Sequence, residues 1–177
     1  GIYEPGSTFK IVTVAGAIEA GLTEPDERID CQMGSINVFG HTIRDHMPFG
    51  ILSVSETFQK SSDVCSIKLA LRLGNEKFYQ YIRAFGFGEL TGIELPGEAR
   101  GLTKPPERWW KASIGAIAMG QEIGVTPLQI STAASTVANG GVRVRPSILL
   151  DDPANREVQL RLASLSDGKN HPAAPIR

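Results

Sequence analysis

The sequence predicts an α+β fold in which helices dominate, on the basis of three observations. Residues that start and stop helices frame several apolar segments along the chain. Strand-like alternation is short: it predicts an irregular hairpin within residues 30–45 and one strand over residues 142–150 that is interrupted at Pro146. The hydrophobic share of 41% in 177 residues is enough for one buried core. We therefore expect one domain over residues 1–150 and a polar loop or frayed end over residues 151–177.

Composition and charge exclude several functional classes. Lysine and arginine number 18 against 19 acidic residues, a net charge of −1, so the chain has no basic field for nucleic acid or for an anionic membrane surface. The longest apolar stretch, residues 11–18, is far shorter than the roughly 20 residues of a membrane span. The chain begins without Met and without a secretory signal, so we expect it to be an excerpt of a longer protein.

Two cysteines, Cys31 and Cys65, leave their chemistry open. They could form one disulfide, as suits an oxidising compartment, or remain two buried thiols. A metal site with His41 and His46 is a third alternative, because these histidines have zinc-like spacing. It is disfavoured, because no second cysteine lies near Cys31 to form the usual pair.

The first expected helix starts at Ser7, after Pro5 and Gly6, and is closed by Gly21. It is apolar nearly all the way round, which predicts a central, buried helix. Lys10 is its only ionisable residue before the last turn. Burying an ammonium group is costly unless a neighbouring group uses it.

Four further helices and one loop are expected. The helix starts rest on a capping box at residues 53–56 and on Thr126, Pro127 and Gln129, which combine an N-cap, a first-turn proline and a capping glutamine. The expected helices cover residues 53–60, 64–73, 75–86 and 126–138, and the Gly- and Pro-rich loop covers residues 86–106.

Ser7 and Lys10 form an S-x-x-K motif that has a mechanism as well as a pattern. Residues three apart share a helix face, and a neutral lysine amine can accept the proton of a serine nucleophile. The motif alone is weak, because residues 166–169 match it too, without any helix signal. The ordinary alternative is an N-cap serine followed by a lysine that extends along the surface.

Ser61, Ser62 and Asp63 lie in the break between two expected helices. A second catalytic pair of the S-x-N type would be placed there, with Ser61 and Asp63 as its members. Residues 35–37 match S-x-N literally but fall in the expected hairpin. The alternative for residues 61–63 is a simple helix cap.

Four blocks together resemble the transpeptidase domain of class B penicillin-binding proteins, most closely the division-specific septal type. The resemblance covers about residues 1–150, which would form a partial transpeptidase domain. The blocks are residues 3–10 (Y-E-P-G-S-T-F-K), 60–64 (K-S-S-D-V), 85–98 (F-G-F-G, then T-G-I-E-L-P-G-E) and 119–141 (M-G-Q, then V-T-P-L-Q and A-N-G-G).

The resemblance implies the helical part of the penicillin-binding protein and serine β-lactamase fold, with most of the central sheet outside this chain. It also implies acyl transfer. Ser7 would attack the penultimate D-Ala carbonyl of a peptidoglycan stem peptide, and an amine of another stem would resolve the ester into a cross-link. Lys10 would take the serine proton, Ser61 would relay a proton to the leaving amine, and Asp63 would occupy the position of the family's asparagine.

Further implications concern partners and location. β-Lactams would acylate Ser7, and proteins of the cell-division complex would be partners. No cofactor and no nucleic acid are implied. The catalytic domain would lie on the outer, periplasmic side of a bacterial cytoplasmic membrane, with an anchor outside this chain.

Two departures from the family pattern bear on activity. Asp63 replaces asparagine, and an ionised carboxylate donates no hydrogen bond and favours a charged Lys10. Asp63 could be neutral, the base could act differently, or a proton could be shared between Lys10 and Asp63. The chain also contains no Lys-Thr-Gly or Lys-Ser-Gly, the family's third element, so we expect residues 1–177 alone to be inactive.

Two alternatives therefore stay open. One is a non-catalytic domain that senses β-lactams or acts as a scaffold in a cell-wall complex, which the Asp63 replacement keeps possible. The other is a serine D,D-carboxypeptidase or β-lactamase. Against a β-lactamase, no motif identifies a glutamate that could activate a deacylating water.

Overall fold

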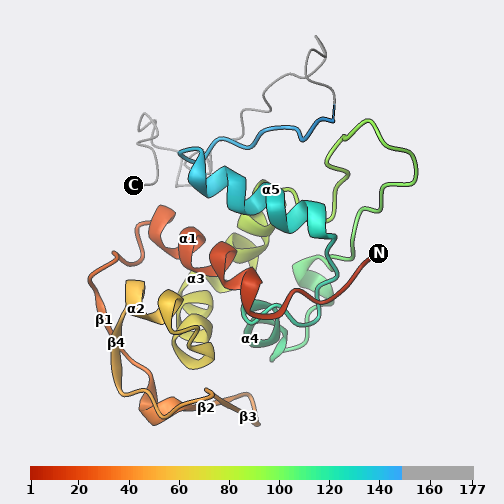
Figure 1. Ribbon diagram of the computed structural model, residues 1–177. Helices are drawn as coiled ribbons and strands as arrows, with labels where there is room; N and C mark the ends of the chain where they lie inside the picture. Colours follow the sequence, from red (N-terminus) through yellow and green to blue (C-terminus); the bar gives the residue numbers. More distant parts are fainter. Residues whose placement is uncertain (149–177) are drawn as a thin grey trace.

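The computed structural model describes residues 1–148, and in it helices dominate, as predicted (Figure 1). The helix α1 packs against α2, α3 and α5, and most of its residues are buried, as predicted. The helices are α1 (Lys10–Glu19), α2 (Val54–Gln59), α3 (Asp63–Ala84), α4 (Ser113–Ala118) and α5 (Pro127–Ala138), and the short 3₁₀ turns are η1 (Gly6–Phe9), η2 (Gln32–Gly34) and η3 (Pro106–Arg108).

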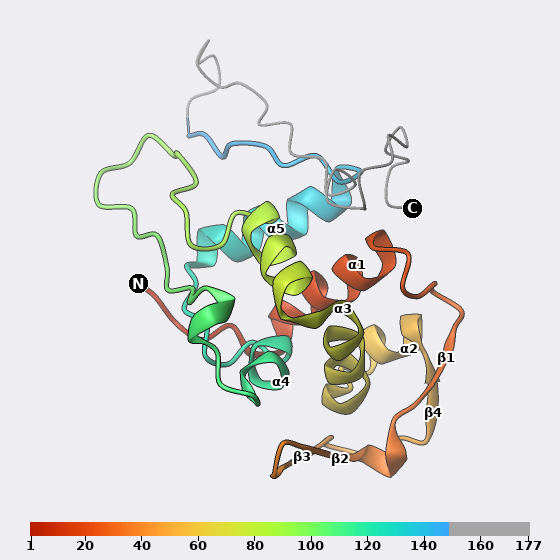
Figure 2. The same ribbon diagram turned by 180° about the vertical axis from the view of Figure 1, so that it is seen from behind.

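The strands are few and lie on the opposite side of the molecule from α5 (Figures 1 and 2). Among the described residues they form two separate antiparallel pairs, and the second pair is the expected hairpin. The first pair was not expected, because its strands are only three residues long. The pairs are β1 (Arg28–Asp30) with β4 (Ile51–Ser53), and β2 (Ser35–Val38) with β3 (His41–Arg44).

The prediction of a strand over residues 142–150 is wrong for residues 142–148, the part of it that the structure describes. Residues 142–148 belong to no strand, although Val142 forms an isolated bridge, and residues 149 and 150 lie outside the described part. Pro146 has no N–H to donate to a ladder. The neighbouring Arg145 is instead held to Glu94 by an ion pair of 3.1 Å.

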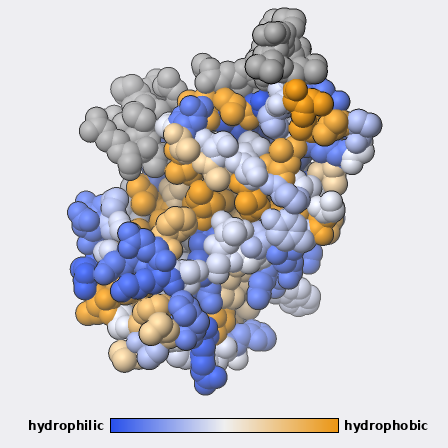
Figure 3. All heavy atoms as spheres, viewed as in Figure 1, coloured by the Kyte–Doolittle hydropathy of each residue, from blue (hydrophilic) through white to orange (hydrophobic). Residues whose placement is uncertain are grey.

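The apolar character of α1 is explained by its burial. Phe9, just before α1, and Val12 within it are fully buried. At Gly16 a side chain would lie about 3.1 Å from the Tyr81 ring, so the glycine permits close contact between α1 and α3. Figure 3 shows apolar residues collected across the middle of this face, near α1 and α5, and hydrophilic residues near the strands at the lower left.

The helices follow the sequence signals with three differences. The first helix was expected to start at Ser7, but residues 6–9 form the 3₁₀ turn η1 and α1 begins at Lys10. The two helices expected on either side of Gly74 form one element, α3, which is kinked where Gly74 adopts φ +75° and ψ 165°. Helix α4 was not predicted, because its N-cap is Ala112, which supplies no side-chain cap. The capping boxes of α2 and α5 are both present as expected.

The expected polar end over residues 151–177, and with it the domain boundary after residue 150, lies outside the described residues. Within residues 1–148, no helix has the length and the apolar character that crossing a membrane requires.

Candidate active site

Lys10 lies at the centre of the candidate site. Its side chain is 1% exposed, and Nζ lies 3.0 Å from Ser7 Oγ, 2.9 Å from Ser61 Oγ and 2.6 Å from Asp63 Oδ1. The same amine donates to the Ser61 backbone carbonyl at 2.7 Å. The structure therefore brings together all four side chains that the sequence proposed as catalytic.

The four acceptors around Lys10 exceed what an ammonium group can serve. An ammonium carries three N–H donors, while Ser7 Oγ, Ser61 Oγ, Ser61 O and Asp63 Oδ1 all lie within hydrogen-bond distance. At any moment one N–H must therefore be shared between two acceptors, or one of the four contacts carries no hydrogen bond. Lys10 Nζ thus lies within hydrogen-bond distance of both serine hydroxyls, the distance that proton transfer between such groups requires.

The nucleophile candidate Ser7 lies in the turn η1, directly before α1. This turn is held from both sides, because Thr8 Oγ1 donates to Pro5 O at 2.8 Å and Gly6 N donates to Gly120 O at 3.0 Å. Gly120 has φ +80°, and a side chain there would collide with the backbone of Gly6. Ser7 itself is exposed, whereas the Lys10 side chain that it contacts is buried.

Ser61 and Asp63 are placed by the break between α2 and α3. Ser61 adopts φ +55°, a left-handed conformation that is costly for a residue other than glycine. This turn directs both the carbonyl and the hydroxyl of Ser61 to Lys10. Ser62 is buried and caps α3 by accepting from Cys65 N at 3.1 Å, and Asp63 is the first residue of the helix.

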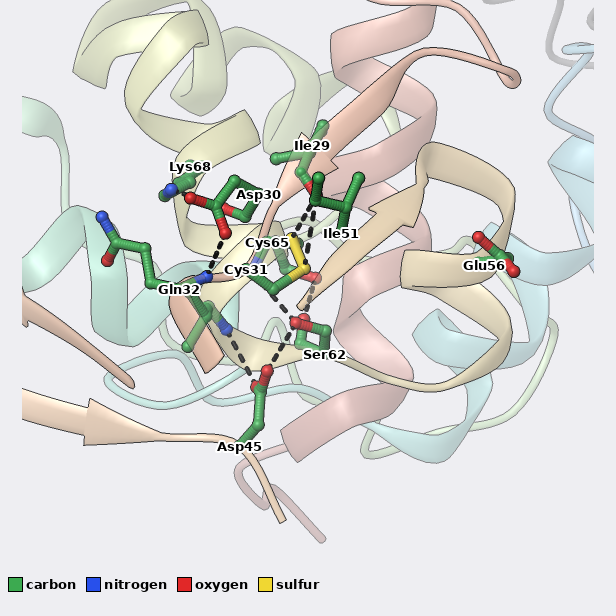
Figure 4. Close-up of a disulfide and its surroundings, with 12 residues drawn as sticks. Ile29, Asp30, Cys31, Gln32, Asp45, Ile51, Glu56, Ser62, Cys65 and Lys68 are labelled. Atoms are coloured by element: carbon green, nitrogen blue, oxygen red, sulfur yellow. Dashed lines mark hydrogen bonds between the residues drawn. A yellow bond between two sulfur atoms is a disulfide. The ribbon is translucent and has the colours of Figure 1, made fainter. Parts of the chain in front are cut away.

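Asp45 is a residue of the site that sequence reasoning missed. It follows strand β3, and its carboxylate accepts from Ser62 Oγ (2.8 Å), Asp63 N (2.5 Å) and Val64 N (3.0 Å). Figure 4 shows Asp45 and Ser62 next to each other, below the disulfide. Its sequence signal is slight, since a single acidic residue after a hairpin strand has many ordinary explanations.

The cysteine question is resolved by a disulfide between Cys31 and Cys65, whose Cα atoms are 5.1 Å apart (Figure 4). The alternatives of two free thiols and of a metal site built on both thiolates are therefore wrong. The bond joins the segment after β1 to the first turn of α3, two residues after Asp63. Within residues 1–148 no group of three or more His, Cys, Asp or Glu side chains is arranged to hold a metal ion.

Two other segments match the catalytic motifs, residues 35–37 and residues 166–169, and the structure describes only the first. Ser35 and Asn37 lie on β2, and Asn37 Oδ1 accepts from Gly40 N at 3.0 Å, so this match is part of the hairpin turn. The second S-x-x-K match, residues 166–169, lies outside the described residues.

Comparison with known proteins gives three kinds of match. The family model described as the penicillin-binding protein transpeptidase domain matches residues 1–165. The penicillin-binding protein PbpB of Mycolicibacterium smegmatis is 46% identical over 149 residues, which are 83% of this chain and 23% of the relative. The peptidoglycan D,D-transpeptidase FtsI of Escherichia coli is 32% identical over 152 residues, which are 86% of this chain and 26% of the relative.

The fold is found in a solved relative as well. The crystal structure of penicillin-binding protein 3 from Mycobacterium tuberculosis, complexed with aztreonam, has a TM-score of 0.82 and 34% identity, and the match covers 93% of this chain and 39% of that one. The chain thus spans about a quarter of the length of the curated relatives that it matches. With the family model covering most of its length, the chain belongs to the penicillin-binding protein transpeptidase domain family.

Proposed function

We propose that the protein is a serine-type peptidoglycan D,D-transpeptidase that cross-links the cell wall through an acyl-enzyme on Ser7. The observation that carries this proposal is the 3.0 Å contact between Ser7 Oγ and the buried Nζ of Lys10. An exposed hydroxyl over a buried amine is the arrangement that nucleophilic acyl transfer needs. The relatives named transpeptidases support the same chemistry.

The proposed reaction has two halves. In the first, Lys10 Nζ accepts the proton of Ser7, and Oγ attacks the penultimate D-Ala carbonyl of a stem peptide. The C–N bond then breaks, Ser61 Oγ passes a proton to the leaving amine, and the terminal D-Ala departs. In the second half, an amine of a neighbouring stem attacks the ester, an amide cross-link forms, and Ser7 regains its proton. The 2.9 Å contact between Ser61 Oγ and Lys10 Nζ supports this relay.

Asp63 is proposed to work with Lys10 as a proton-sharing pair. Its Oδ1 lies 2.6 Å from Nζ, so a proton can move between the two groups along one hydrogen bond. With the proton on the carboxyl group, Lys10 is a neutral amine whose lone pair is available to Ser7. This is the form in which lysine can act as a general base.

We also propose ligands and a location for the protein. The solved relative binds aztreonam and, in a second crystal structure, ampicillin. β-Lactams are proposed to acylate Ser7 in the same way, and cell-division proteins are proposed as partners. The disulfide favours an oxidising compartment, which supports a place on the outer side of the cytoplasmic membrane.

The test is labelling of the full-length protein with a fluorescent penicillin. The wild type should form a stable ester that migrates with the protein, and S7A should form none. S35A is the matched control, since Ser35 belongs to the competing motif on β2 and should leave labelling unchanged. Equal labelling of S7A and the wild type would contradict the proposal.

A second candidate function is a β-lactam-sensing or scaffolding domain without turnover, and the carboxylate of Asp63 at 2.6 Å from Lys10 is the observation that favours it. The variant D63N separates the two. If Asp63 shares a proton with Lys10, D63N should acylate about ten-fold more slowly or worse. Faster acylation of D63N would indicate an impaired site. Rapid hydrolysis of the ester would instead indicate a β-lactamase.

A further inference from the structure

We infer that Asp45 is a positioning residue of this site: its carboxylate fixes the first turn of α3, so that Ser61 and Asp63 meet Lys10. This inference rests on the proposed function, because it assigns a role within the same acyl-transfer site. It begins from a contact across the chain. Asp45 lies 17 to 19 residues before the groups that it binds, in the segment directly after β3.

The first turn of any helix leaves four backbone N–H groups without partners inside the helix. In α3 two of them, those of Asp63 and Val64, donate to Asp45 Oδ1 at 2.5 and 3.0 Å. The third, of Cys65, donates to Ser62 Oγ, and that hydroxyl in turn donates to Asp45 Oδ2 at 2.8 Å. Asp45 therefore satisfies two N–H groups directly and orients the side chain that satisfies a third.

This cap decides where the side chain of Asp63 can go. Asp63 is itself an acidic residue in the first turn, where a carboxylate is attracted to unpaired N–H groups and to the positive end of the helix dipole. Because Asp45 already occupies those N–H groups, the Asp63 carboxylate is left to Lys10, at 2.6 Å. Without Asp45, the helix end and Lys10 would compete for the same carboxylate.

The cap also bears on Ser61. Its left-handed conformation at φ +55° persists only if the residues on both sides are held. Lys10 holds the carbonyl and the hydroxyl of Ser61 from one side, at 2.7 and 2.9 Å. Asp45 holds the following residues, Ser62 and Asp63, from the other side. Lys10 and Asp45 thus hold consecutive residues of one turn.

The test measures acylation of the full-length protein by a penicillin in two ways: the rate constant per active site, and the fraction of sites that can be labelled. D45A should lower the rate constant about 10- to 100-fold, the loss expected when a reacting group shifts by about 1 Å. D45N should stay within about five-fold of the wild type, because its amide oxygen can still accept from both N–H groups. D45E, which keeps the charge but moves the carboxylate by one methylene, should be slower than D45N.

The matched control is D30A. Asp30 also uses Oδ1 to accept a backbone N–H, that of Gln32 at 2.8 Å, but it does not touch the turn at residues 61–63. It should leave the acylation rate constant unchanged. If D45A does not yield folded protein, the acylation rate constants of D45N and D45E give the same test. A purely electrostatic role predicts that D45E, which keeps the negative charge, acylates faster than D45N, whereas a positioning role predicts that it acylates more slowly.

Three results would overturn the inference: D45A acylating within two-fold of the wild type, D45A lowering only the labelled fraction, or D45E acylating faster than D45N. The second would mean that Asp45 supports folding alone. Failure of the underlying function would look different, because the wild type itself would then form no ester on Ser7.

Discussion

Lys10 shows how much of this site is decided by single residues. The Lys10 side chain is 1% exposed, and burying its ammonium group without partners would cost a prohibitive amount of free energy. Here four oxygen atoms lie within hydrogen-bond distance of it. The burial of the amine was predictable from its place in an apolar helix. Its contact with Ser7 was predictable too, because residues three apart share a helix face.

A prediction at this scale concerns the strained backbone of Ser61. S61G and S61A both remove the hydroxyl that contacts Lys10, so both should slow acylation. Only S61G relieves the left-handed conformation at φ +55°, so it should be more stable than S61A by about 1 kcal/mol. Thermal unfolding and penicillin acylation of the two variants check this. Equal stability would show that the backbone at Ser61 relaxes when its side chain is cut.

The sequence alone could identify some residues of the site but not others. Ser7, Lys10, Ser61 and Asp63 lie in local motifs whose spacing is visible along the chain. Asp45 acts on residues 17 to 19 positions away, across a segment that contains β4 and α2, and no local pattern records that contact. The disulfide is similar: two cysteines permit a bond, but only the fold places their Cα atoms 5.1 Å apart.

At the scale of elements, helix ends were predictable where side chains cap them. The capping box of α2 is an example: Ser53 accepts from Glu56 N at 3.0 Å, and Glu56 accepts from Ser53 N at 2.8 Å. Helix α4 was missed because it has no such cap, and the β1–β4 pair because strands of three residues carry too little pattern. Contacts with other elements stabilise α4 and the β1–β4 pair, and the local sequence does not indicate those contacts.

The capping box gives a pH prediction. The hydrogen bond from the Ser53 backbone lowers the pKa of Glu56, assisted by Lys60 and Arg28. A carboxyl group whose pKa is lowered by folding stabilises the folded state when the pH is above the pKa of the unfolded chain, about 4.3. This contribution is lost as the pH falls through the pKa of the folded state. E56Q should therefore be less stable than the wild type at pH 7, and the difference should shrink below about pH 4. A difference in melting temperature that is constant with pH would contradict this.

A second prediction for an element concerns the turn η1. G120A would force a side chain into the backbone of Gly6, and backbone atoms cannot move aside as a flexible side chain does. It should cost about 1–3 kcal/mol more than its control and slow acylation at Ser7 at least ten-fold. The matched control is G97A, which has nearly the same backbone conformation, φ +78° against +80°, with open space around it. If unfolding and acylation of the two variants agree, the contact with η1 is unimportant.

At the scale of the molecule, the helices surround α1 while the strand pairs lie to one side, and the disulfide ties the two regions together (Figures 1 and 4). The helix-rich α+β class was predictable, because helix signals dominate the sequence. The packing of α3 and α5 against α1 was not, because it depends on contacts far apart in the chain.

The disulfide gives the prediction at this scale. Cys31 and Cys65 are 34 residues apart, and a cross-link over that distance should stabilise the fold by about 3–4 kcal/mol in the chain-entropy model. Adding a reductant should lower the unfolding midpoint of the wild type. The double variant C31S/C65S should already have the lower midpoint and should not respond to reductant. A wild-type midpoint that is insensitive to full reduction would contradict the prediction.

The depth of Lys10 beneath Ser7 has a consequence for chemical selectivity. A free amine is by itself a better nucleophile than an alcohol. If both groups were exposed, an acylating drug would therefore modify the lysine nitrogen and form an amide that does not turn over. Here the Lys10 side chain is 1% exposed, and Ser7, which contacts its nitrogen, is exposed to solvent. An electrophile arriving from solvent would meet the serine first, and the product of the proposed reaction would be an ester that a second amine can still cleave. Amine-selective reagents such as succinimidyl esters should accordingly spare Lys10 while modifying the surface lysines.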